Sequence, residues 1–177
     1  MAVRRKHIRN LVERILTNQK VVNAPIEIEN IAHLYGVKVQ YEPAQDNLSG
    51  FLLRNLKEHK AIIGVNQSHH PNRQRFTIAH ELGHFFLHET ERMYVDRIFQ
   101  VKLRNENSSK GISTEEKEAN LFAAEILMPV RFLKKDLAQV NTLDLYEDEK
   151  LKDLSEKYQV STQAFTFRLA YLNYIQL

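Results

Sequence analysis

The sequence predicts an α+β domain, with a small antiparallel sheet early in the chain and a mainly helical C-terminal part. Three observations support this class. Short apolar or alternating runs, which are typical of strands, lie between residues 37 and 65. Apolar residues recur at helical spacing on both sides of that region. The content of 43% hydrophobic and 27% charged residues is typical of a folded globular chain.

Two helices are expected before the sheet. In residues 7–16 the apolar side chains recur every three or four positions, which predicts an amphipathic helix with its basic residues toward solvent. A second helix is expected from Pro25 to Gly36, because proline suits the first position of a helix and glycine readily follows its end.

The net charge is only +3, so charge alone does not indicate strong nucleic-acid binding.

Three antiparallel strands are expected next, at residues 37–41, 50–53 and 61–65, with a polar turn at 55–60. In the first run valine and tyrosine alternate with polar neighbours, whereas the other two runs are more continuously apolar. The strand at 61–65 is expected to offer an open edge, on which an extended peptide adds as a further strand.

A central helix is expected at residues 71–88, apolar on most sides. The polar segment 102–113 predicts a mobile surface loop. The following helix opens near Ser113, with Glu116 three residues later as in a capping box, and this structural role accounts for the carboxylate. That helix ends before Pro129, because the residue before a proline avoids the helical conformation. Further helices are expected at residues 131–139, 143–157 and 161–174.

The stretch His80-Glu81-Leu82-Gly83-His84 carries the main chemical prediction. Residues four apart share one face of a helix, so His80 and His84 can point their imidazoles at one ion about 2.0–2.1 Å away. A catalytic zinc takes three protein ligands and keeps one place for water, whose pKa it lowers to about 7. Glu81, next to the first histidine, can accept the proton of that water. We therefore expect a zinc site with Glu81 as the general base.

The third ligand is expected to be a carboxylate from a later helix. The chain has no cysteine, so zinc must bind His, Asp or Glu. His88 lies about 12 Å along the helix axis from His80, too far for both to bind one ion, and is expected to support the site or to stabilise the oxyanion. Tyr94 is a further candidate for the oxyanion. We favour Glu118 as the ligand and keep Glu125 as the alternative, because the two share a helix face and only one can reach the ion.

The chain resembles a known family, the ImmA/IrrE metallopeptidases. The resemblance covers residues 25–170 in order and spacing and rests on two separate matches. These are residues 73–84, which contain the His-Glu-x-x-His pattern (HExxH), and the residues Glu118-Ala119-Asn120, Phe122-Ala123-Ala124 and Leu127-Met128-Pro129. The resemblance implies a zincin-like domain that binds Zn2+ through His80, His84 and Glu118 and uses Glu81 as the general base.

Family members of this size are similar to proteases of phages and mobile elements that cleave a helix-turn-helix repressor after a signal such as DNA damage. The resemblance therefore implies a site-specific endopeptidase that acts as an antirepressor, with a helix-turn-helix repressor as its partner. This substrate is an analogy with the family and does not follow from the spacing of the residues.

Two functions without proteolysis remain as alternatives. Residues 151–158 and 161–174, joined by a short link, predict a helix-turn-helix-like pair. Its second helix offers mainly Gln163 and Arg168 to DNA, amid aromatic residues, so core packing or a repressor-docking surface is favoured over direct DNA binding. In the other alternative, the zinc site regulates binding without cleaving a substrate.

The expected organisation has three parts. Residues 1–20 form an N-terminal amphipathic helix, residues 21–130 form the zinc metallopeptidase core, and residues 131–177 form a helical, helix-turn-helix-like segment. The chain has no apolar run of about 18 residues, and its basic start is not followed by the apolar stretch of a signal peptide. We therefore expect a cytoplasmic protein without membrane contact.

Overall fold

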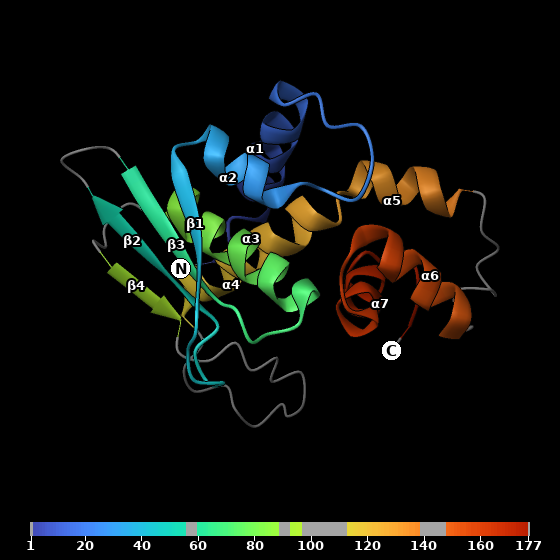
Figure 1. The fold of residues 1–177 in the computed structure, drawn as a ribbon. Helices are drawn as coiled ribbons and strands as arrows, with labels where there is room; N and C mark the ends of the chain where they lie inside the picture. Colours follow the sequence, from blue (N-terminus) through green and yellow to red (C-terminus); the bar gives the residue numbers. More distant parts are fainter. Residues whose placement is uncertain (1, 56–59, 89–92, 97–112, 139–147, 177) are drawn as a thin grey trace.

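The computed structural model describes residues 2–55, 60–88, 93–96, 113–138 and 148–176 (Figure 1). The segment 102–113, expected to be a surface loop, lies outside these ranges except for Ser113. The described elements, in chain order, are α1 (Arg5–Asn18), α2 (Ile28–Leu34), β1 (Val37–Glu42), β2 (Gly50–Asn55), β3 (Lys60–Asn66), α3 (Pro71–Leu87), β4 (Met93–Asp96), α4 (Thr114–Leu127), α5 (Val130–Leu137), α6 (Asp148–Tyr158) and α7 (Thr162–Tyr171). This order confirms the α+β class. Within the described ranges, no helix has the length and apolar character needed to cross a membrane.

The sheet has four strands in the order β1-β3-β2-β4 and is mixed. β2 and β3 form an antiparallel hairpin, and β4 pairs antiparallel with β2. β1 instead runs parallel to β3, with Val39 opposite Ile63. The prediction of three antiparallel strands is therefore wrong for β1, because the hairpin places β3 between β1 and β2.

β3 lies inside the sheet, so the prediction of an open edge at residues 61–65 is also wrong. Ile63 pairs with Val39 of β1 and with Leu52 of β2, and it is fully buried. The run at residues 61–65 is continuously apolar, which is consistent with an interior position in the sheet. Among the described strands, the outer positions belong to β1 and β4.

α2 leads into β1 through a glycine turn. The helix begins at Ile28, three residues after the start expected at Pro25, and buries Ile28, Ile31 and Ala32. Gly36 follows the helix with a φ of 75°, a left-handed conformation that glycine adopts without the strain of a side chain. The glycine predicted to end this helix therefore does so.

The helices lie to one side of the sheet in successive layers (Figure 1). α3 packs against β2 and β3 and also against α4, while α1 packs against α4. α1 buries Ile8, Val12, Ile15 and Leu16, which form the apolar stripe expected of an amphipathic helix. α4 is thus enclosed between the N-terminal helix and the helix that carries the histidines.

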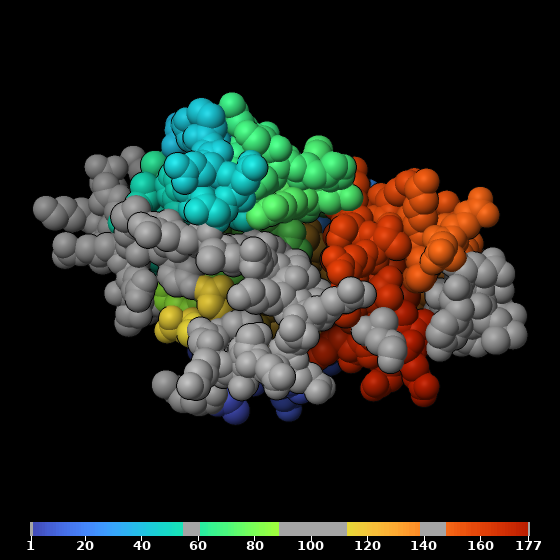
Figure 2. All heavy atoms as spheres, turned by 90° about the horizontal axis from the view of Figure 1, so that it is seen from below, coloured from blue at the N-terminus to red at the C-terminus, as the bar shows by residue number. Residues whose placement is uncertain are grey.

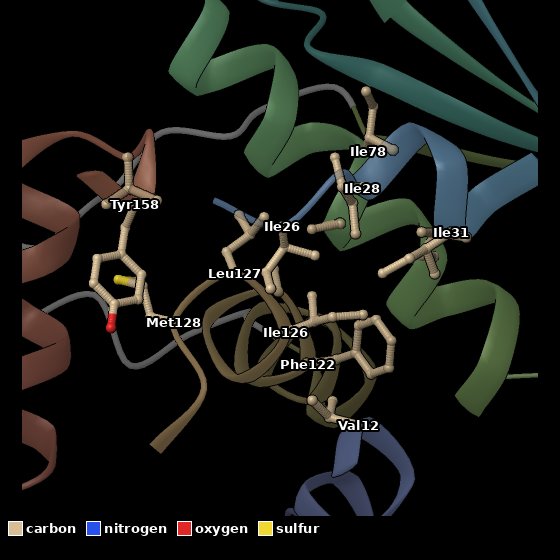
Figure 3. Close-up of a cluster of buried hydrophobic side chains, with 14 of the residues drawn as sticks. Val12, Ile26, Ile28, Ile31, Ile78, Phe122, Ile126, Leu127, Met128 and Tyr158 are labelled. Carbon is tan, nitrogen blue, oxygen red and sulfur yellow. The ribbon is translucent and has the colours of Figure 1, made fainter. Parts of the chain in front are cut away.

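The apolar core surrounds α4 and fixes the position of α3 beside it. Figure 3 shows Phe122, Ile126 and Leu127 of α4 among side chains that come from α1, α2 and α3, such as Val12 and Ile78. All five are at most 1% exposed. Side chains packed at this density leave little room for one helix to rotate or slide against another. The core therefore sets which residues α3 and α4 turn toward each other.

The C-terminal helices α6 and α7 pack on each other. They lie beside the start of α3. In Figure 2 they form the orange and red side of the molecule, next to the green N-terminal part of α3. His70 and Asn72 from that part line one pocket together with Ser161 and Thr162 at the start of α7. Ser161 caps α7, since its hydroxyl accepts a hydrogen bond of 3.1 Å from the backbone N–H of Ala164.

A buried ion cluster joins α7 to α4 and α1. Arg168 is 2% exposed and lies 2.8 Å from Glu125, with further hydrogen bonds to the carbonyl of Met128. Arg9 of α1 reaches the same carboxylate at 3.1 Å. Arg168, one of the two side chains of this helix that could contact DNA, is therefore turned into the core. Its placement fits the packing role favoured for the second helix of this pair.

We expect Glu125→Gln to lower the free energy of unfolding by roughly 3–5 kcal/mol, because it leaves the buried guanidinium of Arg168 without its counter-charge. Burial raises the pKa of Glu125, but Arg168 and Arg9 outweigh burial and hold it below the ordinary value of 4.5. A carboxylate with a depressed pKa stabilises the fold above that ordinary value and loses its contribution as the pH falls. Urea unfolding should therefore show a difference between wild type and variant that narrows below pH 4.5. A difference that stays constant into acid would contradict this assignment.

Candidate metal centre

α3 brings two histidines together at its contact with α4. The helix starts at Pro71, a residue suited to the first helical position, and its apolar faces pack on the sheet and on α4. His80 and His84 lie one turn apart and are 0% and 1% exposed. Their Nε2 atoms are 3.1 Å apart, and their rings meet edge to face. Both imidazoles therefore direct the same ring nitrogen to one region of space.

Glu116 of α4 completes this group. One of its carboxylate oxygens lies 3.4 Å from Nε2 of His80, and the other lies 3.4 Å from Nε2 of His84. In the described part of the chain, His80, His84 and Glu116 form a group whose ligand atoms all lie within 4.8 Å of one another. The sequence interpretation assigned Glu116 to the helix cap alone. The backbone N–H of Glu116 does take part in the cap, since it donates a hydrogen bond to the Ser113 hydroxyl. The side chain of Glu116, however, turns to the histidines.

The spacing of these atoms fits a zinc ion. Two ligand atoms about 2.0–2.1 Å from a tetrahedral metal lie about 3.3 Å from each other. The contacts of 3.1, 3.4 and 3.4 Å among His80, His84 and Glu116 match that value. Two imidazoles and one carboxylate are also a ligand set found in catalytic zinc sites. The residues present therefore fit the metal that the sequence predicted.

The outer nitrogens of both rings are held by neighbours. Nδ1 of His80 lies 3.0 Å from the amide oxygen of Asn120, and Nδ1 of His84 lies 3.1 Å from Nδ1 of His88. A carboxamide oxygen only accepts hydrogen bonds, so His80 carries its proton on Nδ1 and its Nε2 presents a lone pair. Partners of this kind fix the tautomer and the ring orientation of metal-binding histidines.

The charge balance also favours metal binding. Burial lowers the pKa of His84, although its hydrogen bond with Glu116 opposes that change, so the neutral imidazole that a metal requires is favoured. Burial raises the pKa of Glu116, but the hydrogen bonds with His80 and His84 outweigh burial and bring it to about 2. The neutral form of His84 and the ionised form of Glu116 are therefore both favoured near neutral pH.

Glu118 and Glu125, the two carboxylates proposed from the sequence as third ligand, lie elsewhere. Glu118 binds Arg4, which reaches it at 2.5 Å, and its second partner is His88 at 3.2 Å. Arg4 is the main cause of the low pKa of Glu118, about 2. Glu125 belongs to the ion cluster with Arg168. Residues two apart on a helix leave it about 200° apart, so α4 turns Glu116 toward the histidines and directs Glu118 to other partners. Glu116 is therefore the carboxylate that we propose as third ligand in place of Glu118.

Glu81 and His88 lie close to the two histidines along the chain, whereas Tyr94 belongs to a different element. Glu81 follows His80 on α3 and is 0% exposed. Its side chain lies toward the start of β2, since a methyl group placed on Gly50 would sit 3.9 Å from Cγ of Glu81. His88 contacts His84 rather than the point shared by the ligand atoms. Tyr94 lies in β4, where only the backbone falls within the described part of the structure.

Gly83 allows α3 and α4 to approach closely at this site. A Cβ atom at residue 83 would lie 2.9 Å from Cα of Ala119 and 3.2 Å from Cβ of Phe122. No contact this short with backbone is tolerated without movement of one helix. The glycine inside the His-Glu-x-x-His stretch is therefore explained by the helix contact that brings Glu116 to the histidines.

We expect Gly83→Ala to destabilise the metal-free protein by about 1–3 kcal/mol, the usual cost of overpacking. In an exposed helix the same change would stabilise by roughly 0.5–1 kcal/mol, so the sign separates the two effects. Urea unfolding with chelator present measures it. A urea midpoint higher in the variant than in the wild type would show that the contact between α3 and α4 accommodates a Cβ atom at residue 83.

Three residues of the site escaped sequence analysis. Glu116 and Asn120 are four apart on α4, as His80 and His84 are on α3, and this matching interval was the available clue. Nothing in the sequence indicates that Arg4 belongs to the site, because Arg4 stands in a run of basic residues of the kind that usually faces solvent.

The chain is similar to known proteins over most of its length. The family described as "Peptidase_M78: IrrE N-terminal-like domain" matches residues 32–170. Metallopeptidase ImmA of Bacillus subtilis (strain 168) is 29% identical over 136 residues, covering 76% of this chain and 71% of that protein. A solved chain named Mycobacterium tuberculosis transcriptional regulator shares the fold, with a TM-score of 0.61 at 17% identity over 93% of this chain. This chain spans only 46% of that protein. Because the family match covers most of the sequence, the chain belongs to the IrrE N-terminal-like peptidase family.

Proposed function

We propose that the protein is a zinc-dependent endopeptidase. The observation that carries the proposal is the group of His80, His84 and Glu116, with Glu81 beside it on α3. Membership of a peptidase family supports hydrolysis of peptide bonds. The ligand chemistry supports zinc in particular, because two imidazoles and one carboxylate leave a fourth tetrahedral position for water.

The chain's own groups divide the reaction between them. Zinc would supply a Lewis acid that activates water and polarises the scissile carbonyl. Glu81 would take the proton from the attacking water and deliver it to the departing amine. Its complete burial keeps bulk water from competing for that proton. Tyr94 remains our candidate for stabilising the oxyanion, whereas the two ring nitrogens of His88 contact His84 and Glu118.

An extended peptide substrate suits the sheet edge nearest this site. Gly50 at the start of β2 lies against the α3 face that carries Thr77 and Glu81. β4 pairs with β2 so that Asp96 is opposite Gly50, and β4 is the outer strand on that side of the described sheet. We propose that the substrate adds to β4 as a further strand, a common mode of peptide recognition.

A helix-turn-helix repressor is the substrate that we propose within this class. The proposal rests on the resemblance of residues 73–84 and 118–129 to the ImmA/IrrE metallopeptidases, and it makes the protein an antirepressor. Regulation without proteolysis is the alternative. Direct reading of DNA by α7 is disfavoured, because Arg168 is buried in an ion pair and cannot reach a groove.

Two measurements on the purified protein test this proposal. Elemental analysis should find one zinc ion per chain, removable by chelator and restored by added zinc. The zinc-loaded protein, incubated with a helix-turn-helix repressor encoded beside its gene, should cut the repressor into two defined fragments, and chelator should stop the reaction. Zinc binding without cleavage would favour the regulatory alternative. Failure to bind any divalent metal would exclude both.

A further inference from the structure

A chain of polar side chains leads from α1 to the second histidine of the metal group. Arg4, just before α1, binds both carboxylate oxygens of Glu118, at 2.9 Å from Nε and 2.5 Å from Nη2. Glu118 lies 3.2 Å from Nε2 of His88. Nδ1 of His88 lies 3.1 Å from Nδ1 of His84. This series of hydrogen bonds connects Arg4 to His84, a predicted metal ligand, through Glu118 of α4 and His88 at the end of α3.

The donor in each of these hydrogen bonds follows from the chemistry of its groups. An ionised carboxylate only accepts, so His88 must donate from Nε2 to Glu118. With Nε2 as its donor, His88 accepts at Nδ1, which requires that His84 donate from its own Nδ1. His84 is thereby left with its lone pair on Nε2, the atom that lies near Nε2 of His80 and near Glu116. The donor-to-acceptor direction of these hydrogen bonds therefore selects the tautomer of His84 that binds a metal.

Arg4 is fitted to hold this chain in place. Its backbone N–H also donates to Glu118, at 2.8 Å, and Nη2 reaches the carbonyl of Leu87 at 3.2 Å. The first contact is made to α4, and the second is made to the last residue of α3. Glu118 is 3% exposed, so without Arg4 its charge would stay buried with His88 as its remaining side-chain partner. A lysine could not replace the paired donors of the guanidinium.

We propose that Arg4, Glu118 and His88 form a positioning relay that holds His84 in its metal-binding tautomer and so raises the affinity for zinc. The inference rests on the proposed function, because it takes His84 as a zinc ligand. None of the three relay residues touches substrate in this scheme. Their effect passes through the orientation of one imidazole, as partners of metal-binding histidines commonly act.

Long-range 1H–15N NMR spectra of the zinc-loaded protein test the direction of the relay without any mutation. We expect His88 to carry its proton on Nε2 and His84 to carry its proton on Nδ1. A proton on Nδ1 of His88 would overturn the inference, because His84 would then face a donor. A metal-free sample provides the reference spectrum.

Zinc affinity tests whether the relay acts as one unit. Competition with a chromogenic chelator should show a Kd about 10-fold higher for Arg4→Ala and about 10- to 100-fold higher for His88→Phe. In the double variant, the loss should equal that of His88→Phe alone to within about twofold, since the relay is already broken there. Arg5→Ala and His7→Phe, two exposed neighbours on α1, serve as matched controls and should bind zinc like the wild type.

The outcomes separate the relay from the proposed function. A wild-type protein that binds no zinc would refute the proposed function. Normal zinc binding by the wild type with unchanged affinity in Arg4→Ala would refute the relay alone, and so would losses that simply add in the double variant. Circular dichroism of each metal-free variant checks folding. If His88→Phe does not fold, the NMR tautomers and the affinity of Arg4→Ala still decide the inference.

Discussion

Replacing Glu81 by glutamine is expected to leave zinc bound and to lower the cleavage rate by about 10²–10⁴-fold, the usual contribution of a general base. The amide keeps the shape of the side chain but cannot accept the proton of the attacking water. Zinc should stay because Glu81 is absent from the group formed by His80, His84 and Glu116. Rate and zinc content are measured on the same preparation with the repressor as substrate.

Glu115→Gln provides the matched control for that experiment. It makes the same chemical change at an exposed position in the first turn of α4 and should alter neither the rate nor the zinc content. If Glu81→Gln cleaves at the wild-type rate, Glu81 is not the base. If it loses zinc as well as activity, the loss of rate says nothing about proton transfer, and Glu81 must instead be needed to hold the metal site together.

The part of the site that could be predicted from the sequence lies within a single helix. The interval between His80 and His84 fixes their common face by helix geometry alone, and the apolar residues around them identify the helix. Which carboxylate joins the two histidines as third ligand depends on how α4 is rotated about its axis. Side chains such as Phe122 and Ile126 set that rotation through contacts with other helices, which the local sequence does not record.

The order of the strands in the sheet could not be predicted from the sequence for a similar reason. Alternation and apolar runs identified all three strands between residues 37 and 66, because these patterns arise within each strand. Whether β3 lies inside the sheet or at its edge depends on which strand β1 joins. The continuous apolar run Ala61–Val65 favours an interior strand, but it does not say which neighbour is parallel.

The same glutamate-to-glutamine change at three positions of α4 should give three different results. Glu116→Gln should weaken zinc binding by more than roughly 100-fold, beyond the range expected for residues that only support a ligand. Glu118→Gln should weaken it by about 10- to 100-fold, because it disturbs His88 and not the ion itself. Glu125→Gln should destabilise the fold and leave zinc affinity unchanged, because its partners are Arg9 and Arg168. Chelator competition gives the affinities, and urea unfolding gives the stabilities.

This comparison is sensitive because charge, size and helix are the same in all three variants, so only the position differs. The rotation of α4 in the structure places Glu116 against both Nε2 atoms, 3.4 Å from each. If Glu118→Gln abolishes zinc binding while Glu116→Gln retains it, the carboxylate ligand is Glu118, as the sequence first indicated, and α4 must rotate when the metal binds. Equal losses at both positions would mean that the two carboxylates share the ion. A loss confined to Glu116 requires no movement of α4 at all.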